Sequence, residues 1–186
     1  MRIIAGIYKG RKLKGSSDLS IRPTTGRVKE LIFNVLQDFP QNKITVDIFS
    51  GSGSLGIEAI SRGAKQVIFV DLSERSLSVL KENLNTIGVP EEKYSIVKSD
   101  AINFARKADF PVDLLLLDPP FKYPELQTLV DLLVSSNLMT NKSVLVVEHE
   151  TINPLKTESD LYEVLIQKKM GRSLISFIVK KENHER

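Results

Sequence analysis

Along the chain, segments whose hydrophobic residues have the spacing of a strand alternate with segments whose hydrophobic residues have the spacing of a helix. Short apolar runs rich in β-branched residues predict strands near residues 44–49, 66–70, 94–98, 112–117 and 143–148. Between these runs, apolar residues spaced three and four apart predict helices near 54–62, 73–87, 100–107 and 123–135. Strands that alternate with helices indicate an α/β protein with a doubly wound, mostly parallel sheet and helices on both faces.

Two runs lack any polar alternation, which is typical of central strands covered on both faces. These are Leu114–Leu117 and Val144–Val147. The last part of the chain differs, because residues 161–167 and 173–179 predict two strands around Met170, Gly171 and Arg172. We expect them to pair antiparallel at one edge of the sheet, followed by a frayed tail over residues 180–186.

The N-terminal residues carry a separate pattern. Residues 1–15 alternate around Gly6 and Gly10 and predict a short β-hairpin with a basic face. Pro23 then interrupts regular secondary structure, and Thr24 or Thr25 can cap the helix that follows. Its apolar face comprises Val28, Leu31, Ile32, Val35, Leu36 and Phe39. We therefore divide the chain into a hairpin extension, residues 1–21, and a main domain, residues 22–186.

Composition narrows the class of protein. With 186 residues, 41% hydrophobic and 26% charged, the chain has the make-up of one soluble globular domain. It contains no cysteine, which excludes disulfides, thiolate metal sites and a cysteine nucleophile. Two histidines are too few for a metal cluster, and no apolar run has the length of a membrane span. No long apolar core follows the basic start, so we expect no signal peptide, a cytoplasmic location, and neither metal nor membrane as partner.

Charge is distributed unevenly along the chain. Residues 1–29 contain eight basic residues and one acidic residue, a net charge of +7. The remaining residues contain 18 basic and 22 acidic side chains, a net charge of −4. This asymmetry favours an anionic partner for the N-terminus, with nucleic acid preferred over a membrane. The alternative is a solvated basic arm without a partner.

A glycine-rich loop follows the first strand of the main domain. Gly51, Gly53 and Gly56 have the spacing of a dinucleotide fingerprint, directly before a predicted helix. Asp71 follows the next strand about 20 residues later, where an acid can bind ribose hydroxyls. Such a loop carries a nucleotide-like ligand at the carboxyl end of the first strand. The pattern leaves open a dinucleotide, S-adenosylmethionine, or a tight turn without a ligand.

A second motif, Asp118-Pro119-Pro120-Phe121, directly follows the Leu-rich strand. In a doubly wound sheet this position lies beside the glycine loop, at the topological switch point. The two prolines stiffen the turn, so that Asp118 and the Pro119 carbonyl can point at one place while Phe121 forms a flat wall. Two acceptors and an aromatic face suit an exocyclic amino group on a planar base. The alternative is a plain loop with Phe121 in the core.

Together these motifs resemble those of S-adenosylmethionine-dependent methyltransferases that act on amino nitrogens, with a Rossmann-like class I fold. More narrowly, the chain resembles the bacterial RsmD family, which methylates the N2 amino group of one guanine in 16S ribosomal RNA. Besides the tetrapeptide, the segments that carry this resemblance are residues 1–6, 22–24, Arg27, 47–53, 55–59 and 61–64. Ala5, Phe121 and Met170 depart from the commoner glycine, tyrosine and tyrosine of the family.

The resemblance implies roles for individual residues. Catalytic positions are Asp118, Pro119, Pro120 and Phe121. Cofactor contacts are implied at Asp47, Phe49, Gly51, Ser52, Gly53, Asp71, Leu72, Asp100, Ala101 and Asp118. For Asp100, a helix N-cap is an alternative that can hold at the same time. Contacts to 16S ribosomal RNA, in the small subunit or an assembly intermediate, are expected at Arg2, Lys9, Arg11, Lys12, Lys14, Arg22, Thr24 and Arg27.

Three other functions compete with this interpretation. A DNA adenine-N6 methyltransferase can use the same tetrapeptide, but no segment here is free to supply a large recognition region. A protein-glutamine methyltransferase is built on a similar motif, but the basic N-terminus favours nucleic acid. A binding module or dinucleotide oxidoreductase leaves Asp118–Phe121 without a role.

Overall fold

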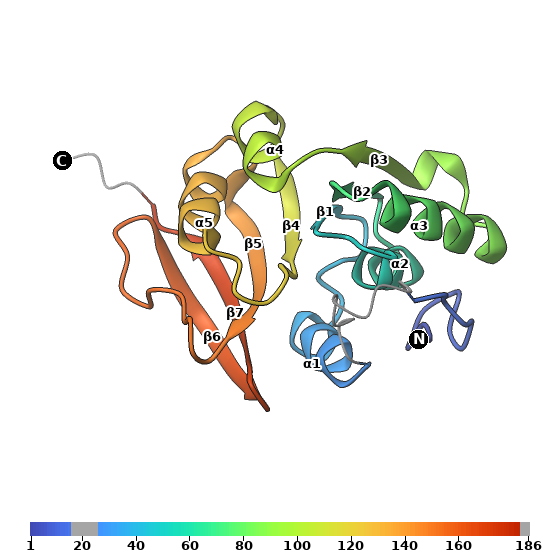
Figure 1. Ribbon diagram of the computed structural model, residues 1–186, viewed down its shortest axis with the longest axis horizontal. Coiled ribbons are helices and arrows are strands. Elements are labelled where there is room, and N and C mark those ends of the chain that lie inside the picture. Colours follow the sequence, from blue (N-terminus) through green and yellow to red (C-terminus); the bar gives the residue numbers. More distant parts are fainter. Residues whose placement is uncertain (16–25, 183–186) are drawn as a thin grey trace.

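The computed structural model describes residues 1–15 and 26–182. Within this part, the strands form one seven-stranded sheet in the order β3-β2-β1-β4-β5-β7-β6 (Figure 1). The strands are β1 (Ile44–Ile48), β2 (Gln66–Asp71), β3 (Tyr94–Lys98), β4 (Val112–Leu117), β5 (Met139–Glu150), β6 (Tyr162–Met170) and β7 (Ser173–Lys180). The expected N-cap residues Thr24 and Thr25, and the expected RNA contact Arg22, lie outside the described residues.

Strand directions confirm the predicted fold class. The five strands β1 to β5 pair in parallel, whereas β7 pairs antiparallel with both β5 and β6. The chain builds outward from β1 through β2 to β3, and then returns to place β4 on the other side of β1. The switch point therefore lies between β1 and β4, where a doubly wound sheet opens a crevice at its carboxyl edge.

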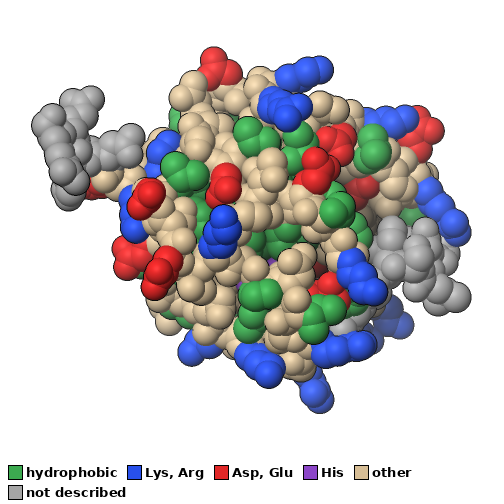
Figure 2. All heavy atoms as spheres, turned by 60° about the vertical axis from the view of Figure 1, so that its left-hand side comes forward, with side chains coloured by type: hydrophobic (Ala, Val, Ile, Leu, Met, Phe, Trp, Pro, Cys, Tyr) green, Lys and Arg blue, Asp and Glu red, His purple; other side chains and the backbone are tan. Residues whose placement is uncertain are grey.

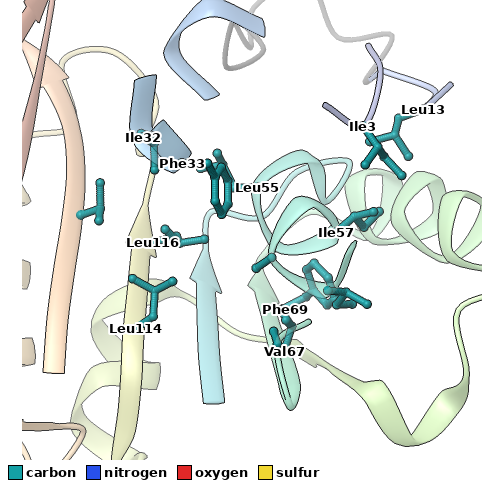
Figure 3. Close-up of a cluster of buried hydrophobic side chains, with 14 of the residues drawn as sticks. Ile3, Leu13, Ile32, Phe33, Leu55, Ile57, Val67, Phe69, Leu114 and Leu116 are labelled. Atoms are coloured by element: carbon teal, nitrogen blue, oxygen red, sulfur yellow. The ribbon is translucent and has the colours of Figure 1, made fainter. Parts of the chain in front are cut away.

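Helices cover both faces of the sheet, and each face has its own apolar core. They are α1 (Gly26–Leu36), α2 (Ser54–Ser61), α3 (Glu74–Ile87), α4 (Ala101–Lys107) and α5 (Leu126–Ser135), with a 3-10 turn at Glu91–Lys93. One core contains residues of α1, α2 and α3 (Figure 3), and the other contains residues of α4 and α5. Successive residues of β4 alternate between the cores: Leu114 and Leu116 face the first, Leu115 and Leu117 the second. Each such fully buried side chain contributes about 1.5–3 kcal/mol relative to an exposed one.

Two element boundaries differ from those expected. Helix α5 begins at Leu126 rather than near residue 123. Pro124 explains this, because a proline disfavours helical backbone at the residue before it and keeps Tyr123 in the loop. Strand β5 is longer than expected at both ends, because Met139 pairs with Val112 of β4 at one end and the other end pairs antiparallel with β7 as far as Glu150 opposite Ser173.

The N-terminal hairpin is minimal and is packed against the main domain. A single antiparallel bridge joins Arg2 and Lys12. Ile3 and Leu13 are almost fully buried in the first core, beside α2 and α3 (Figure 3). The two arms thus contribute apolar residues to the core while their basic side chains remain outside. None of the helices in the described part combines the length and apolar character needed to cross a membrane.

Candidate functional site

A pocket with a volume of about 210 Å³ opens at the carboxyl edge of the sheet, at the switch point between β1 and β4. The segments that line it come from the loop after β1, the end of β2, the turn after β4, the end of β5 and the N-terminal residue. Its lining residues are Met1, Asp47, Phe49, Ser50, Gly51, Ser52, Ser54, Leu55, Asp71, Asp118, Pro119, Pro120, Phe121, Lys122, Tyr123, Leu126, Glu148, His149, Glu150 and Asn153.

Strand register explains why residues so distant in sequence meet here. Ile48 of β1 pairs with Val70 of β2 and with Leu117 of β4, and Leu117 pairs with Val147 of β5. The next residue on each strand therefore falls on one row across the carboxyl edge. This row comprises Asp71, Phe49, Asp118 and Glu148, and all four line the pocket.

The glycines of the loop serve different purposes. Gly51 adopts a φ of +53°, a left-handed backbone conformation that favours glycine, while the space around its α-carbon is open. At Gly53, with φ of +85°, a Cβ would lie 2.3 Å from Leu80, and the glycine therefore allows α3 to pack closely. At Gly56 a Cβ would lie 2.3 Å from the ring of Phe69, which marks the close approach of α2 to β2.

The aspartate at the end of β2 holds this loop in place. Asp71 accepts hydrogen bonds from the backbone N–H of Gly51 and of Ser73, both at 2.8 Å, one to each carboxylate oxygen. Each oxygen retains a further lone pair for a ligand in the pocket. The acid that the sequence analysis expected to bind ribose thus also orients the glycine loop.

Asp47 lies at the base of the pocket and is almost fully buried. Its Oδ2 accepts the backbone N–H of Gly56 at 2.8 Å, which joins β1 to the first turn of α2. Burial raises the pKa of Asp47 from 3.8 to about 7, although the bond from Gly56 opposes the shift. Its carboxyl group therefore changes charge near neutral pH.

The turn after β4 is fastened to both neighbouring strands. The backbone N–H of Asp118 donates to the Ile48 carbonyl at 3.5 Å, and that of Lys122 donates to Glu150 of β5 at 2.8 Å. These bonds hold the tetrapeptide between β1 and β5. Phe121 is 43% exposed and lines the pocket, so its ring is not part of the core.

Tyr123 is a site residue that the sequence analysis did not identify. Its ring meets that of Phe49 edge-on, with centroids 5.1 Å apart and planes at 70°. Burial raises its pKa, and the nearby carboxylates of Asp100 and Glu125 raise it further. The available signal was the helix-breaking Pro124, which places Tyr123 in the same turn as the tetrapeptide.

Buried polar atoms without hydrogen-bond partners concentrate in this pocket. Within the described residues they are Ser50 Oγ, Ser54 Oγ, Tyr123 Oη, Glu148 Oε2 and His149 Nδ1, with Thr45 Oγ1 outside the lining. Buried polar groups are normally hydrogen-bonded, so these atoms indicate a ligand with polar groups of its own. Glu148 and His149 were also missed from sequence, although both lie at the carboxyl end of a predicted strand, where ligands bind in such sheets.

His149 is held as a neutral ring. Its Nε2 lies 2.8 Å from Ser176 Oγ, while Nδ1 has no partner of good geometry, although the backbone of Glu150 and Asn153 lies near it. Burial lowers the pKa of His149 from 6.5 to about 4. It therefore carries no charge into the pocket at neutral pH.

Gly53 is not among the lining residues, although its neighbours Ser52 and Ser54 are, and three further predicted cofactor contacts also lie beside the lining. Leu72 follows β2 and is 62% exposed. Asp100 caps α4 by accepting the backbone N–H of Asn103 at 3.1 Å, so the N-cap alternative holds, and Ala101 follows it in the first turn. These residues stay predicted contacts, at the ends of β2 and β3 next to the row that contains Asp71.

The basic residues of the N-terminus differ in their contacts, and Arg2 donates to the Gly10 carbonyl within the hairpin at 3.3 Å. Arg11 donates to the Ile87 carbonyl at 3.1 Å and Lys14 forms an ion pair with Glu82, so both bind α3. Lys9 and Lys12 are exposed and form no ion pair with any residue of the described part. Lys29, counted in the +7 charge, is buried, and it cannot contact a partner.

Further basic residues lie away from the N-terminus. Lysine and arginine side chains gather along the lower margin of the face in Figure 2, at the end of the molecule where Figure 1 places α1 and the turn between β6 and β7. Arg27 of α1 and Lys168, Lys169 and Arg172 near that turn are exposed. Since Thr151 donates its backbone N–H to the Arg172 carbonyl, this turn adjoins the β5 end of the pocket. No group of histidine and acidic residues among residues 1–15 and 26–182 has the arrangement of a metal site.

Comparisons with known proteins agree with this architecture. The family model described as "Conserved hypothetical protein 95" matches residues 1–179. The chain is 35% identical over 173 residues to "Ribosomal RNA small subunit methyltransferase D" of Haemophilus influenzae, covering 92% of this chain and 89% of that protein. It is 33% identical over 157 residues to the protein of the same name in Escherichia coli K12, covering 84% and 78%. The solved structure "Putative methyltransferase yhhF from Escherichia coli" superposes with a TM-score of 0.86 at 30% identity, covering 97% and 98%.

Proposed function

The chain belongs to the RsmD family, and we propose on that basis that it transfers a methyl group from S-adenosylmethionine to the N2 amino group of a guanine in 16S ribosomal RNA. The coarser part of this statement, a methyltransferase acting on ribosomal RNA, is supported by relatives named for that activity. The observation that carries transfer to an exocyclic amino nitrogen is the position of Asp118-Pro119-Pro120-Phe121, and the choice of guanine rests on the resemblance to the family. This tetrapeptide lines the same pocket as the glycine loop, on one row with Asp71 and Phe49.

The residues of the pocket fit S-adenosylmethionine. The loop from Phe49 to Ser52 and the row that begins at Asp71 offer backbone and carboxylate groups to its amino acid and ribose parts. The partnerless Ser50 and Ser54 hydroxyls supply further hydrogen bonds. When bound, the cofactor provides an electrophilic methyl group on a sulfonium, which is already a good leaving group. Asp47 can balance part of the positive charge of such a ligand when it is ionised.

The turn after β4 suits the acceptor amino group. A guanine N2 nitrogen is a poor nucleophile because its lone pair is delocalised into the ring. Hydrogen bonds from this amino group to Asp118 and the Pro119 carbonyl favour a pyramidal nitrogen with an available lone pair. Because bonds from Lys122 and Asp118 anchor the turn to β5 and β1, these acceptors are held in a defined orientation before the base arrives.

Charge explains why a carboxylate is useful at position 118. Positive charge develops on the nitrogen as the new N–C bond forms, so Asp118 stabilises the transition state more than the ground state. Asp118 can also accept the proton that the nitrogen gives up. The base must leave its stack to reach the pocket, and the exposed Phe121 ring offers a surface on which it can stack instead.

The substrate is proposed to be 16S ribosomal RNA in the small subunit or an assembly intermediate. The exposed Lys9 and Lys12 are the N-terminal residues best placed to contact phosphates, because within residues 1–15 and 26–182 their side chains form neither an ion pair nor a hydrogen bond, whereas Arg2 and Arg11 bind backbone carbonyls. Met1 lines the pocket, so RNA bound along the N-terminal segment would lie close to the pocket that receives the reacting base.

The test is transfer of label from tritiated S-adenosylmethionine to four acceptors: small ribosomal subunits lacking the modification, naked ribosomal RNA, duplex DNA and protein. We expect label in 16S ribosomal RNA, recovered as N2-methylguanine after digestion to nucleosides. Calorimetry should detect S-adenosylhomocysteine binding and no NAD binding. Label only in adenine of DNA or in glutamine would replace the proposal with one of the competing functions, and binding of NAD alone would exclude a methyltransferase.

A further inference from the structure

We propose that Glu148 is the residue that selects guanine, by accepting a hydrogen bond from the ring N1–H next to the methylated amino group. This inference rests on the proposed function and names the feature of the base that the site recognises. It assigns a role to a carboxylate that the methyl-transfer chemistry described above does not use.

The position of Glu148 relative to Asp118 is the first observation. Leu117 of β4 pairs with Val147 of β5, Asp118 directly follows the last residue of β4, and Glu148 is the next residue of β5. Neighbouring strands lie about 4.8 Å apart, and side chains at paired positions stand on the same face of a sheet. Both residues line the pocket. The site therefore presents two carboxylates side by side.

The hydrogen bonds of Glu148 are the second observation. One carboxylate oxygen, Oε1, accepts the hydroxyl of Ser173 on β7 at 2.7 Å. The other oxygen, Oε2, is buried and has no hydrogen-bond partner. Burying a carboxylate oxygen without a hydrogen-bond donor costs free energy, and buried polar atoms in proteins normally have a partner. Ser173 anchors the side chain, and Oε2 remains as an oriented acceptor for a donor on the ligand.

The chemistry of the bases decides which ligand fits. Three bases carry an exocyclic amino group: guanine, adenine and cytosine. In guanine the ring nitrogen next to this group, N1, carries a hydrogen, whereas the corresponding nitrogens of adenine and cytosine are acceptors. With the amino group held at Asp118, Glu148 would receive a hydrogen bond from guanine and would face a lone pair in the other two bases. The pair thus both attracts guanine and repels its competitors.

The test compares guanine with 2-aminopurine at the target position. 2-Aminopurine has the same amino group at C2, but its N1 carries no hydrogen. Once the methylated position is mapped, small subunits are reconstituted with 16S RNA ligated to contain either base there. Two quantities are then measured for the wild type, Glu148→Gln and Glu148→Ala. They are the kcat/KM for methyl transfer and the affinity of the enzyme for the reconstituted subunits in the presence of S-adenosylhomocysteine. The intrinsic reactivity of the two bases cancels when the variants are compared with the wild type.

We expect the wild type to prefer guanine by about 10- to 100-fold, as for a hydrogen bond to a charged group. In Glu148→Gln, the amide oxygen can keep the Ser173 contact while the amide nitrogen faces the pocket as a donor. It then matches the unprotonated N1 of 2-aminopurine, so the preference should vanish or reverse in both measurements. Glu148→Ala should lose the preference without reversing it. Glu163→Gln, at an exposed position of β6, is the matched control and should keep the wild-type preference.

Two results would overturn the assignment in different ways. If Glu148→Gln methylates guanine and prefers it over 2-aminopurine as strongly as the wild type, Glu148 does not read N1 and only holds Ser173. If the wild type transfers no methyl group to guanine in any acceptor, the proposed function fails and the assignment falls with it. Melting temperatures of all variants close to the wild-type value would show that a changed preference does not come from a damaged fold.

Discussion

The Nζ atom of Lys29 lies 3.3 Å from Oε2 of Glu58, and both side chains are shielded from solvent. Glu58 also accepts the backbone N–H groups of Ile4 at 2.8 Å and Ala5 at 3.0 Å, and Lys29 donates to the Arg2 carbonyl at 2.7 Å. This buried pair therefore joins α1 and α2 to the N-terminal segment. Burial lowers the pKa of Lys29, while Glu58 counteracts that shift.

Glu58→Ala should destabilise the protein by about 3–5 kcal/mol, because it leaves a buried ammonium and two backbone donors without their acceptor. Urea unfolding would measure the loss. In hydrogen exchange, the backbone N–H groups of Ile4 and Ala5 should exchange faster than in the wild type. S-adenosylhomocysteine should bind less tightly, because Met1 of the same segment lines the pocket.

The paired change Lys29→Met with Glu58→Gln serves as the control for this network. It removes both charges of the buried pair and keeps an amide oxygen for one of the two backbone donors, although Arg62 loses its carboxylate partner, so it should recover part of the lost stability. A Glu58→Ala protein within 1 kcal/mol of the wild type, where 3–5 is expected, would contradict the importance of the buried pair.

Gly56→Ala should cost more stability than Gly51→Ala. At Gly56 the new Cβ would lie 2.3 Å from Phe69 and 2.9 Å from the Asp47 carboxylate, so α2 must move away from the sheet, at about 1–3 kcal/mol or more. At Gly51 the surroundings are open, and the cost is limited to about 1–2 kcal/mol of left-handed backbone strain. Thermal unfolding of both variants provides the comparison, and a larger loss in Gly51→Ala would show that packing at Gly56 is less tight than described.

Asp47→Asn should remove one component of the pH dependence of stability. The folded-state pKa of Asp47 is about 7, above its ordinary value of 3.8. Between these values the folded protein holds a proton that the unfolded chain has lost, so Asp47 lowers the free energy of unfolding as pH rises from about 4 to about 7. Asparagine does not titrate. The stability of Asp47→Asn relative to the wild type should therefore increase across this window and stay constant above it.

Urea unfolding from pH 5 to pH 8 measures that difference. His149 has the opposite sign, since its lowered pKa makes stability increase with pH between about 4 and 6.5. Because His149 is present in both proteins, its contribution cancels in the comparison. A difference between the two proteins that does not change with pH would refute the raised pKa of Asp47.

Asp118→Ala should reduce methyl transfer by about 10²- to 10³-fold, the typical cost of removing one group that stabilises developing charge. Affinity for S-adenosylhomocysteine should stay within a few-fold of the wild type. Phe121→Ala should instead weaken RNA capture, with an unchanged melting temperature, because its ring is partly exposed. Single-turnover transfer and calorimetry separate these effects, and wild-type transfer by Asp118→Ala would exclude the proposed catalytic role.

Replacing Lys9 and Lys12 with alanine should weaken RNA binding and reduce its salt dependence. Each lost phosphate contact reduces the slope of log affinity against log salt by about 0.9 for a duplex and about 0.7 for a single strand. Cofactor affinity should not change, because neither side chain lines the pocket.

The control for this experiment replaces two exposed lysines outside the N-terminal segment, Lys107 at the end of α4 and Lys142 near the start of β5, with the same loss of charge. Equal slopes for the two double variants would mean that the N-terminal lysines do not contact RNA. Arg11 and Lys14 are left unchanged because both bind α3, and their removal would confound binding with stability.

Much of the fold followed from local patterns. The uninterrupted apolar run Leu114–Leu117 predicted a central strand, and it pairs in parallel with β1 on one side and β5 on the other. The glycine spacing marked the loop after β1, and Asp118 followed a predicted strand end. These features depend on neighbours in sequence, because strand period and turn chemistry are local properties.

The amino-acid sequence by itself determined the order of the strands and helices, the glycine loop and the tetrapeptide that faces it. Only the tertiary structure decided which distant residues share the pocket: pairing of β4 with β5 brought Glu148 beside Asp118, and Pro124 kept Tyr123 against Phe49. It also divided the basic N-terminus into exposed lysines that form no ion pair with the part of the chain that the structure describes, and residues that are bound to α3 or buried against Glu58. The reason is physical, since register and burial depend on long-range packing, which the local pattern of a segment does not contain.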